Sequence, residues 1–281
     1  MLVPQRDRIE RALGLFGEGA IGQPHSLSTR FECLGAEMSV RHLALSQAEL
    51  GQLNRLFSYA SRRLSDIFTR RNLIDFLRSR FDDLSGEDLA AWHSFGALCI
   101  KDFHADLGSF MDAVAPVVLQ ACGAYNTEGE VKLPGFPDIQ HPRGSPKAKA
   151  FRAGLPDEVV AAIDTTNSWW PDVKVIRNIL MHREHDKMVF GGPGVVFQIY
   201  TPGLSPQVVH PVFLWPHGHN VADFRLYSAY VIAEVLVFLE ELGTALASHL
   251  KLSIDGLTGS FRVGDLSYLI DPLREIEHAI A

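Results

Sequence analysis

Three long segments with the periodicity of amphipathic helices place the strongest constraint on how this chain folds. They span about residues 46–70, 85–122 and 220–250, and each carries apolar side chains along one face. Apolar residues that recur every three or four positions indicate helices that bury one side. We therefore expect a mainly α protein, built as a helical bundle.

Local signals predict where these helices begin and end. The apolar pattern of the first segment changes phase past Arg71, which predicts a break near residues 70–72, with Asn72 capping a second helix. Gly123 is the expected stop of the second segment, and Asn220 is the expected cap of the third. Shorter helices are expected from Asp157, from Trp170 and from about residue 265.

The remaining segments predict little regular structure apart from a small β insert at residues 188–215. Residues 188–190 and 195–200 flank four residues of sequence GGPG, which predicts an antiparallel hairpin. Residues 208–215 are the candidate third strand, at an edge because of Pro211. Residues 124–156 hold five prolines and four glycines and are expected to form a long loop. We divide the chain into an N-terminal segment, 1–45, and a helical domain, 46–281.

The charge of the chain is acidic overall but locally basic. The formal net charge is −7, and 7 of the 26 basic residues are lysines, which leaves 19 arginines. Residues 55–80 hold seven of these arginines against two aspartates, a local charge of +5. Four of them share one helix face: Arg55, Arg62, Arg63 and Arg70. This face has two interpretations, a solvated helix surface or a track for the phosphate backbone of a nucleic acid.

The cysteines and the N-terminal residues indicate in which cellular compartment the protein is expected. The three cysteines are Cys33, Cys99 and Cys122, widely spaced and in no paired motif, so neither disulfides nor a cysteine zinc site is expected. Five of the six residues at positions 6–11 are charged, where a signal peptide needs apolar ones. No apolar run approaches the roughly 18 residues of a membrane span. We expect a cytoplasmic protein without a membrane partner.

The segment most informative about chemistry is residues 169–187. On a helical wheel its apolar side chains fall on one face: Val173, Ile176, Ile179 and Leu180. The opposite face carries polar side chains: Lys174, Asn178, His182 and His185, with Arg177 at its flank. Arginine stabilises charge on a phosphate, histidine transfers protons near neutral pH, and asparagine orients a group by hydrogen bonding. This combination predicts phosphoryl chemistry, and no metal or cofactor is required for it.

The six residues from Arg177 to His182, RNILMH, resemble the motif of HEPN-domain ribonucleases, in which an arginine and a polar residue precede a histidine. The resemblance implies a HEPN-like helical bundle with the motif on a helix that faces a second subunit. It implies metal-independent RNA cleavage by the 2′-hydroxyl, with a 2′,3′-cyclic phosphate as product. Arg177 and His182 would be the catalytic pair and Asn178 a positioning residue. Lys174, His185 and the four arginines of residues 55–70 are the candidate substrate-binding residues.

The resemblance also implies partners: RNA, a second copy of the chain, and an inhibitory antitoxin protein in a toxin–antitoxin or anti-phage system. Other interpretations of the segment stay open. Arg177 and His182 can be ordinary surface residues near a helix C-terminus, where cations are favoured. The face can bind RNA, a nucleotide or a protein without cleaving anything. A metal-dependent hydrolase is the remaining alternative, with His182, His185 and Asp186 as ligands and His217 and His219 nearby.

Overall fold

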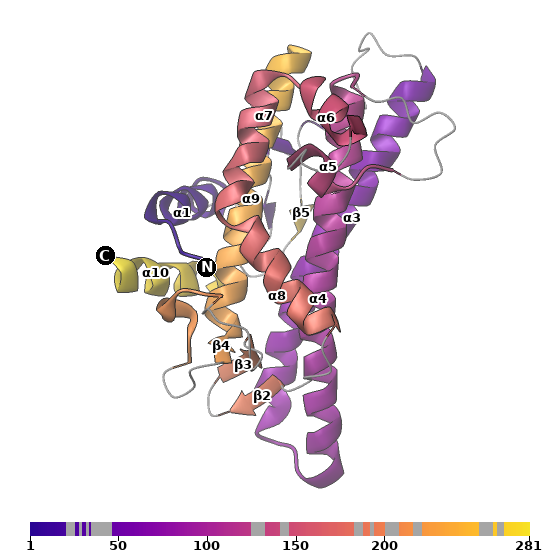
Figure 1. Ribbon diagram of the computed structural model, residues 1–281. Coiled ribbons are helices and arrows are strands. Elements are labelled where there is room, and N and C mark those ends of the chain that lie inside the picture. Colours follow the sequence, from indigo (N-terminus) through magenta and orange to yellow (C-terminus); the bar gives the residue numbers. More distant parts are fainter. Residues whose placement is uncertain are drawn as a thin grey trace.

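A long helical hairpin forms one side of the molecule (Figure 1). Its arms are α3 (Gln47–Phe81) and α4 (Gly86–Ala121), which pack against each other along their length. The third long helix, α9 (Phe224–Leu250), lies beside the hairpin and is buried over most of its residues. These helices occupy the three segments with helical periodicity. The prediction of a mainly α helical bundle is therefore confirmed.

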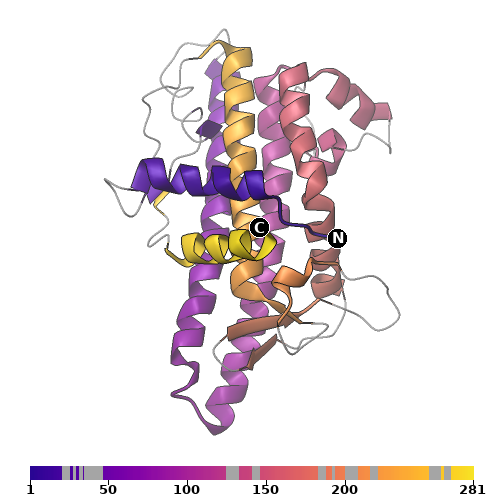
Figure 2. The same ribbon diagram turned by 90° about the vertical axis from the view of Figure 1, so that its left-hand side faces the viewer.

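The computed structural model describes residues 1–20, 26–27, 30–31, 34, 47–124, 133–140, 146–182, 188–191, 194–199, 208–215, 221–252, 261–262 and 267–281. The shorter helices within these ranges are α1 (Arg6–Ala20), α5 (Phe136–Gln140), α6 (Pro146–Ala153), α7 (Asp157–Asp164), α8 (Trp170–His182) and α10 (Ser267–Ile280), with single turns of 3-10 helix at η1 (Thr165–Ser168) and η2 (Pro211–Phe213). Helices α1 and α10 lie side by side and cross α9 (Figure 2).

The expected hairpin is present, but its third strand comes from another segment. Strands β2 (Met188–Gly191) and β3 (Gly194–Gln198) pair antiparallel, and β4 (Val221–Asp223) pairs antiparallel with β3. A second antiparallel pair joins β1 (Ser26–Leu27) to β5 (Phe261–Arg262). The prediction of a strand at 208–215 is wrong. Pro211 lacks an N–H for a ladder and instead begins η2, with isolated bridges at Val209 and Leu214 on either side.

The predicted break in the first long helix is also wrong, because α3 is one continuous helix. Arg71 takes a core position there, with 1% of its surface exposed. Its guanidinium lies over the rings of Phe224 and Tyr268, 5.8 and 5.2 Å from their centroids. A buried arginine breaks the apolar pattern of the sequence without breaking the helix.

Two further corrections concern residues 124–156 and the start of α9. The expected long loop contains α5 and α6, because Phe136 and Ile139 are fully buried and α5 packs on α4. Asp223, not Asn220, caps α9: its carboxylate accepts hydrogen bonds from the backbone N–H groups of Arg225 and Leu226, at 2.8 and 3.3 Å. Asn220 lies outside the described residues.

The described part of the N-terminal segment belongs to the same hydrophobic core as the helical domain. Leu2, Ile9 and Phe16 are buried in one cluster with the apolar side chains of α9. Residues 1–45 therefore contribute to the core rather than forming a separate extension, as far as they are described. Among the described residues, no helix combines the length and apolarity needed to cross a membrane.

Candidate functional site

Helix α8 carries the RNILMH segment and lies on the surface of α4 (Figure 1). Three of the four residues predicted on its apolar face are buried, with Val173 and Ile176 fully covered and Leu180 8% exposed, whereas Ile179 is only half-buried. Trp169 and Trp170 anchor the start of the helix, and both are buried. Because this face is fixed in the core, the opposite face points outward. Lys174 and Asn178 are exposed on it, and Arg177 is half-buried at its edge.

The side chain of Arg177 crosses α4 at Gly108. A β-carbon added at Gly108 would lie only 2.6 Å from Nε of Arg177 and 3.1 Å from its Cζ. Nε of Arg177 is buried and finds no hydrogen-bond partner among the described residues. Nη1 donates a long hydrogen bond of 3.4 Å to Oδ1 of the neighbouring Asn178. The guanidinium thus lies against α4 at Gly108, next to the amide of Asn178, and keeps N–H donors without a partner among the described residues.

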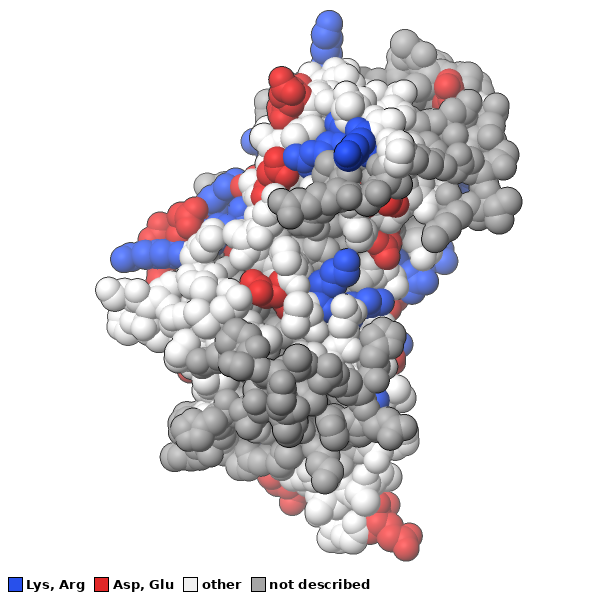
Figure 3. All heavy atoms as spheres, in the orientation of Figure 1, with Lys and Arg blue, Asp and Glu red and all other residues white. Residues whose placement is uncertain are grey.

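Arg177 differs from most described arginines of the bundle in having no carboxylate partner among the residues that the structure describes. Arg70, for comparison, lies 3.5 Å from both Asp102 and Asp106, and Arg152 lies 2.6 Å from Asp164. No ion pair joins Arg177 to a carboxylate of the described residues. Basic side chains lie where α8 borders α4, near the centre of the face in Figure 3. An arginine with uncommitted donors at the surface suits the binding of an anion.

A neutral histidine lies beneath this arginine. His104, one turn before Gly108 on α4, is fully buried, and its Nδ1 lies 2.8 Å from the carbonyl oxygen of Ile100. A carbonyl only accepts, so Nδ1 carries the hydrogen and Nε2 accepts from the hydroxyl of Tyr227 at 3.0 Å. Burial, together with the charge of Arg177, lowers the pKa of His104 to about 4, against the hydrogen bond to Ile100, which raises it. His104 is therefore uncharged at neutral pH.

Contacts with α4 divide the four arginines predicted on one face of α3 into two groups, exposed and paired. Arg55 and Arg62 are exposed and make no ion pair with a described residue. Arg63 instead contacts Asp66 at 3.3 Å and lies 3.8 Å from Asp106 of α4, the aspartate that also pairs with Arg70. Only part of the predicted phosphate track is thus open to solvent and unpaired. The sequence pattern of α3 alone reveals only Asp66, because Asp102 and Asp106 come from α4.

The histidines of the motif are only partly covered by the structure. His182 is the last residue of α8, and its side chain lies outside the described part, as do His185, Asp186, His217 and His219 entirely. Within the described residues, no three histidine, cysteine, aspartate or glutamate side chains gather closely enough to bind a metal. The predicted ligand set of a metal hydrolase stays untested.

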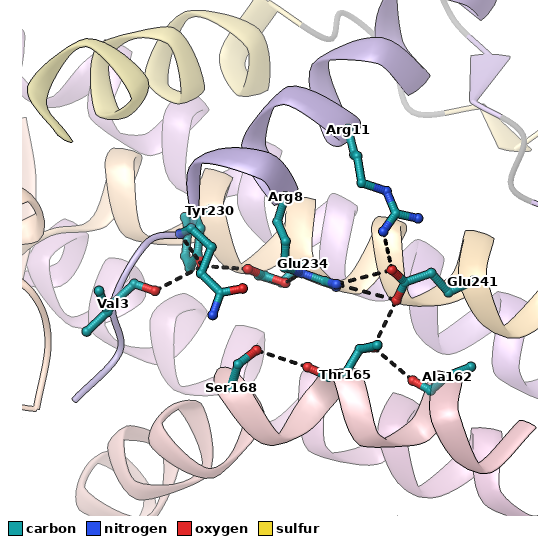
Figure 4. Close-up of polar contacts among 10 residues, drawn as sticks. Val3, Arg8, Arg11, Ala162, Thr165, Ser168, Tyr230, Glu234 and Glu241 are labelled. Atoms are coloured by element: carbon teal, nitrogen blue, oxygen red, sulfur yellow. Dashed lines mark hydrogen bonds and ion pairs between the residues drawn. The ribbon is translucent and has the colours of Figure 1, made fainter. Parts of the chain in front are cut away.

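A second group of ionisable side chains, not predicted from the sequence, lies between α1 and α9 (Figure 4). Arg8 of α1 forms ion pairs with Glu234 and Glu241 of α9, and Arg11 also pairs with Glu241. Tyr230 contacts the other oxygen of Glu234. Burial works against the charge of Arg8, but the two carboxylates outweigh it and raise its pKa. We call these five residues the α1–α9 network.

The α1–α9 network has the character of a structural link. Each carboxylate in it has a guanidinium partner, and Thr165 Oγ1 lies 2.8 Å from Oε2 of Glu241. A cavity of about 470 Å³ next to it is lined by three alanines, by Arg11, Glu241 and Thr165, and by four further polar residues: Glu158, Glu240, Thr244 and Ser248. These contacts fasten α1 and η1 to α9, and Nη2 of Arg8 is the one buried atom of the network that has no hydrogen-bond partner among the described residues. The candidate site therefore stays at α8.

Comparisons with known proteins add no further assignment: no protein-family model, curated protein or solved structure matches the chain.

Proposed function

We propose that the protein is a metal-independent endoribonuclease whose active site is the outward face of α8. The observation that supports this most is the state of Arg177, a half-buried guanidinium that has no carboxylate partner and whose buried Nε has no hydrogen-bond partner within the described part of the chain. It stands next to Asn178 and five residues before His182, in the arrangement that resembles the HEPN motif. A fixed guanidinium with free donors is suited to a phosphate oxygen.

The proposed reaction is an internal transesterification of RNA. The 2′-oxygen attacks the adjacent phosphorus, the bond from phosphorus to the 5′-oxygen breaks, and a 2′,3′-cyclic phosphate forms. The proton of the 2′-hydroxyl passes to a base, and the leaving 5′-oxygen receives a proton. His182 serves in this proton transfer as base or acid. Arg177 stabilises the negative charge that develops on the non-bridging phosphate oxygens, and Asn178 orients the guanidinium or the substrate.

A second copy of the chain completes the proposed site. The outward face of α8 includes two large apolar side chains, Val175 and Met181, with 46% and 42% of their surfaces exposed. They share this face with Lys174 and Asn178. Apolar side chains next to uncommitted polar ones are typical of surfaces that meet a partner. In a homodimer through α8, two motifs face each other and the two copies of His182 supply the base and the acid.

The test compares RNA cleavage by four purified proteins: the wild type, Arg177→Ala, His182→Ala and the control Arg225→Ala. Arg225 is a surface arginine of α9 that pairs with Glu275, so its loss also removes one positive charge. We expect cleavage by the wild type and the control and a loss of at least about 100-fold in both motif variants. RNA binding without cleavage by the wild type would indicate a binding module instead. Equal cleavage by all four proteins would contradict the proposal.

A further inference from the structure

We infer that Gly108 of α4 is a positioning residue for Arg177, holding the guanidinium at the place where it meets the substrate phosphate. This inference rests on the proposed function of α8. It concerns a residue on another helix, 69 positions earlier in the chain than Arg177. Nothing in the HEPN-like motif includes it.

The geometry shows why only glycine fits at this position. A β-carbon at residue 108 would approach three atoms of the Arg177 side chain: Nε at 2.6 Å, Cζ at 3.1 Å and Cδ at 3.2 Å. Real β-carbons do not come within 3.0 Å of such atoms. A β-carbon at residue 108 would therefore require the Arg177 side chain to shift from its position against α4.

The clash involves a side chain and no backbone atom within the closest contacts. The guanidinium lies at the far end of a flexible side chain, so Arg177 can turn away without moving either helix. Glycine inside a helix is also less favourable than alanine, because it loses more backbone freedom on folding. Replacing Gly108 by alanine is thus expected to displace Arg177 while leaving the bundle intact or more stable.

The surroundings of Gly108 favour the same placement. His104 lies one turn earlier on α4, so it shares the face of that helix that Gly108 presents. Its two ring nitrogens are occupied by Ile100 and Tyr227. His104 therefore offers Arg177 neither a hydrogen bond nor a repelling charge. Gly108 leaves the space that the guanidinium occupies, and the neighbouring His104 carries no charge. The N–H donors of the guanidinium therefore stay available for a ligand.

A matched control exists on the neighbouring helix. Gly51 lies inside α3, and a β-carbon there would meet no atom within 4 Å. Gly51→Ala thus makes the same chemical change in a helix without touching Arg177. A merely structural effect of glycine replacement would appear in both variants, whereas a positioning effect appears only in Gly108→Ala.

The first measurement is the rate at which phenylglyoxal modifies Arg177, followed by peptide mass spectrometry. It needs no substrate, so it tests the placement of Arg177 even if the protein does not act on RNA. We expect Gly108→Ala to react several-fold faster than the wild type, because its guanidinium leaves the cover of α4. Gly51→Ala should react at the wild-type rate. An unchanged rate in Gly108→Ala would overturn the inference.

The second measurement is the affinity for a fluorescent single-stranded RNA, by anisotropy, for the wild type, Gly108→Ala, Arg177→Ala and the double variant. We expect Gly108→Ala and Arg177→Ala each to weaken binding by about tenfold or more, as for a lost charged hydrogen bond. The double variant should bind no more weakly than Arg177→Ala, since Gly108 acts through Arg177. If Arg177→Ala weakens binding and Gly108→Ala does not, the inference is wrong while the proposed function stands. If the wild type does not bind RNA, the proposed function fails, and so does the role of Gly108 toward a substrate.

Discussion

Arg8 of α1 and Glu234 of α9 form an ion pair inside the protein, with 6% and 1% of their side-chain surfaces exposed. The two residues are 226 positions apart in the chain. Helix α1 is therefore fastened to the central helix by a charge that is removed from water. Removing one partner of such a pair leaves the other buried without its counter-charge, which is costly.

This relationship predicts the effect of Glu234→Gln. We expect the free energy of unfolding to fall by about 3 kcal/mol, the lower end for a broken buried pair because Glu241 still faces Arg8. The control is Glu275→Gln, whose partner Arg225 is 42% exposed, and it should cost less than about 1 kcal/mol. Urea denaturation of the three proteins measures both changes. Equal stabilities of the two variants would contradict this account of the α1–α9 network.

The buried His104 predicts a dependence of stability on pH. Its pKa is about 4 in the folded protein and 6.5 when exposed, so between these values the unfolded chain binds the extra proton. The contribution of His104 is therefore full above pH 6.5 and decreases as the pH falls toward 4, by about 3 kcal/mol in total. In His104→Gln, this decrease of the unfolding free energy between pH 6.5 and 4 should be absent. Unfolding free energies measured between pH 4 and 7 test it, and parallel profiles for both proteins would refute it.

The effect of replacing a glycine depends on whether the atoms closest to it belong to backbone or to a flexible side chain. A β-carbon at Gly243 of α9 would lie 2.2 Å from the backbone nitrogen of Phe31 and 2.4 Å from the carbonyl carbon of Arg30. Backbone atoms cannot turn away as a guanidinium can. We expect Gly243→Ala to destabilise the fold by about 3 kcal/mol and Gly51→Ala not to destabilise it. Thermal unfolding of both variants is the measurement, and a wild-type melting temperature for Gly243→Ala would contradict it.

The sequence was sufficient for elements whose pattern is local. The presence of the long helices, the β2–β3 hairpin and most of the buried face of α8 follow from the spacing of apolar residues and from turn residues, but the predicted break within α3 was wrong. Contacts between distant segments were not predictable in this way. The sequence alone suggests a surface position for Arg71. The structure shows that its guanidinium lies over the rings of Phe224 and Tyr268, which come from distant segments. Helix α5 depends on burying Phe136 and Ile139, which no pattern of five residues can predict.

The candidate site, too, depends on contacts between distant segments that local sequence patterns do not predict. Asn178 was predicted on the polar face of α8 and Arg177 at its flank; Asn178 is exposed there, and Arg177 is half-buried at the edge. Gly108 was not predicted, because a glycine in a helix gives no sign of which side chain crosses it. Arg63 and Arg70 were expected to face a nucleic acid, yet their partners on α4 include Asp106, which lies between them. Pairing across helices decides which arginines keep a free charge.

The most direct test of the proposed function is the chemistry of the RNA ends after incubation with the wild-type protein in excess EDTA. We expect fragments that end in a 2′,3′-cyclic phosphate and begin with a 5′-hydroxyl, and intact RNA with Arg177→Ala or His182→Ala. Cleavage that requires a divalent metal, fragments with a 5′-phosphate, or RNA that stays intact with the wild type would contradict the account.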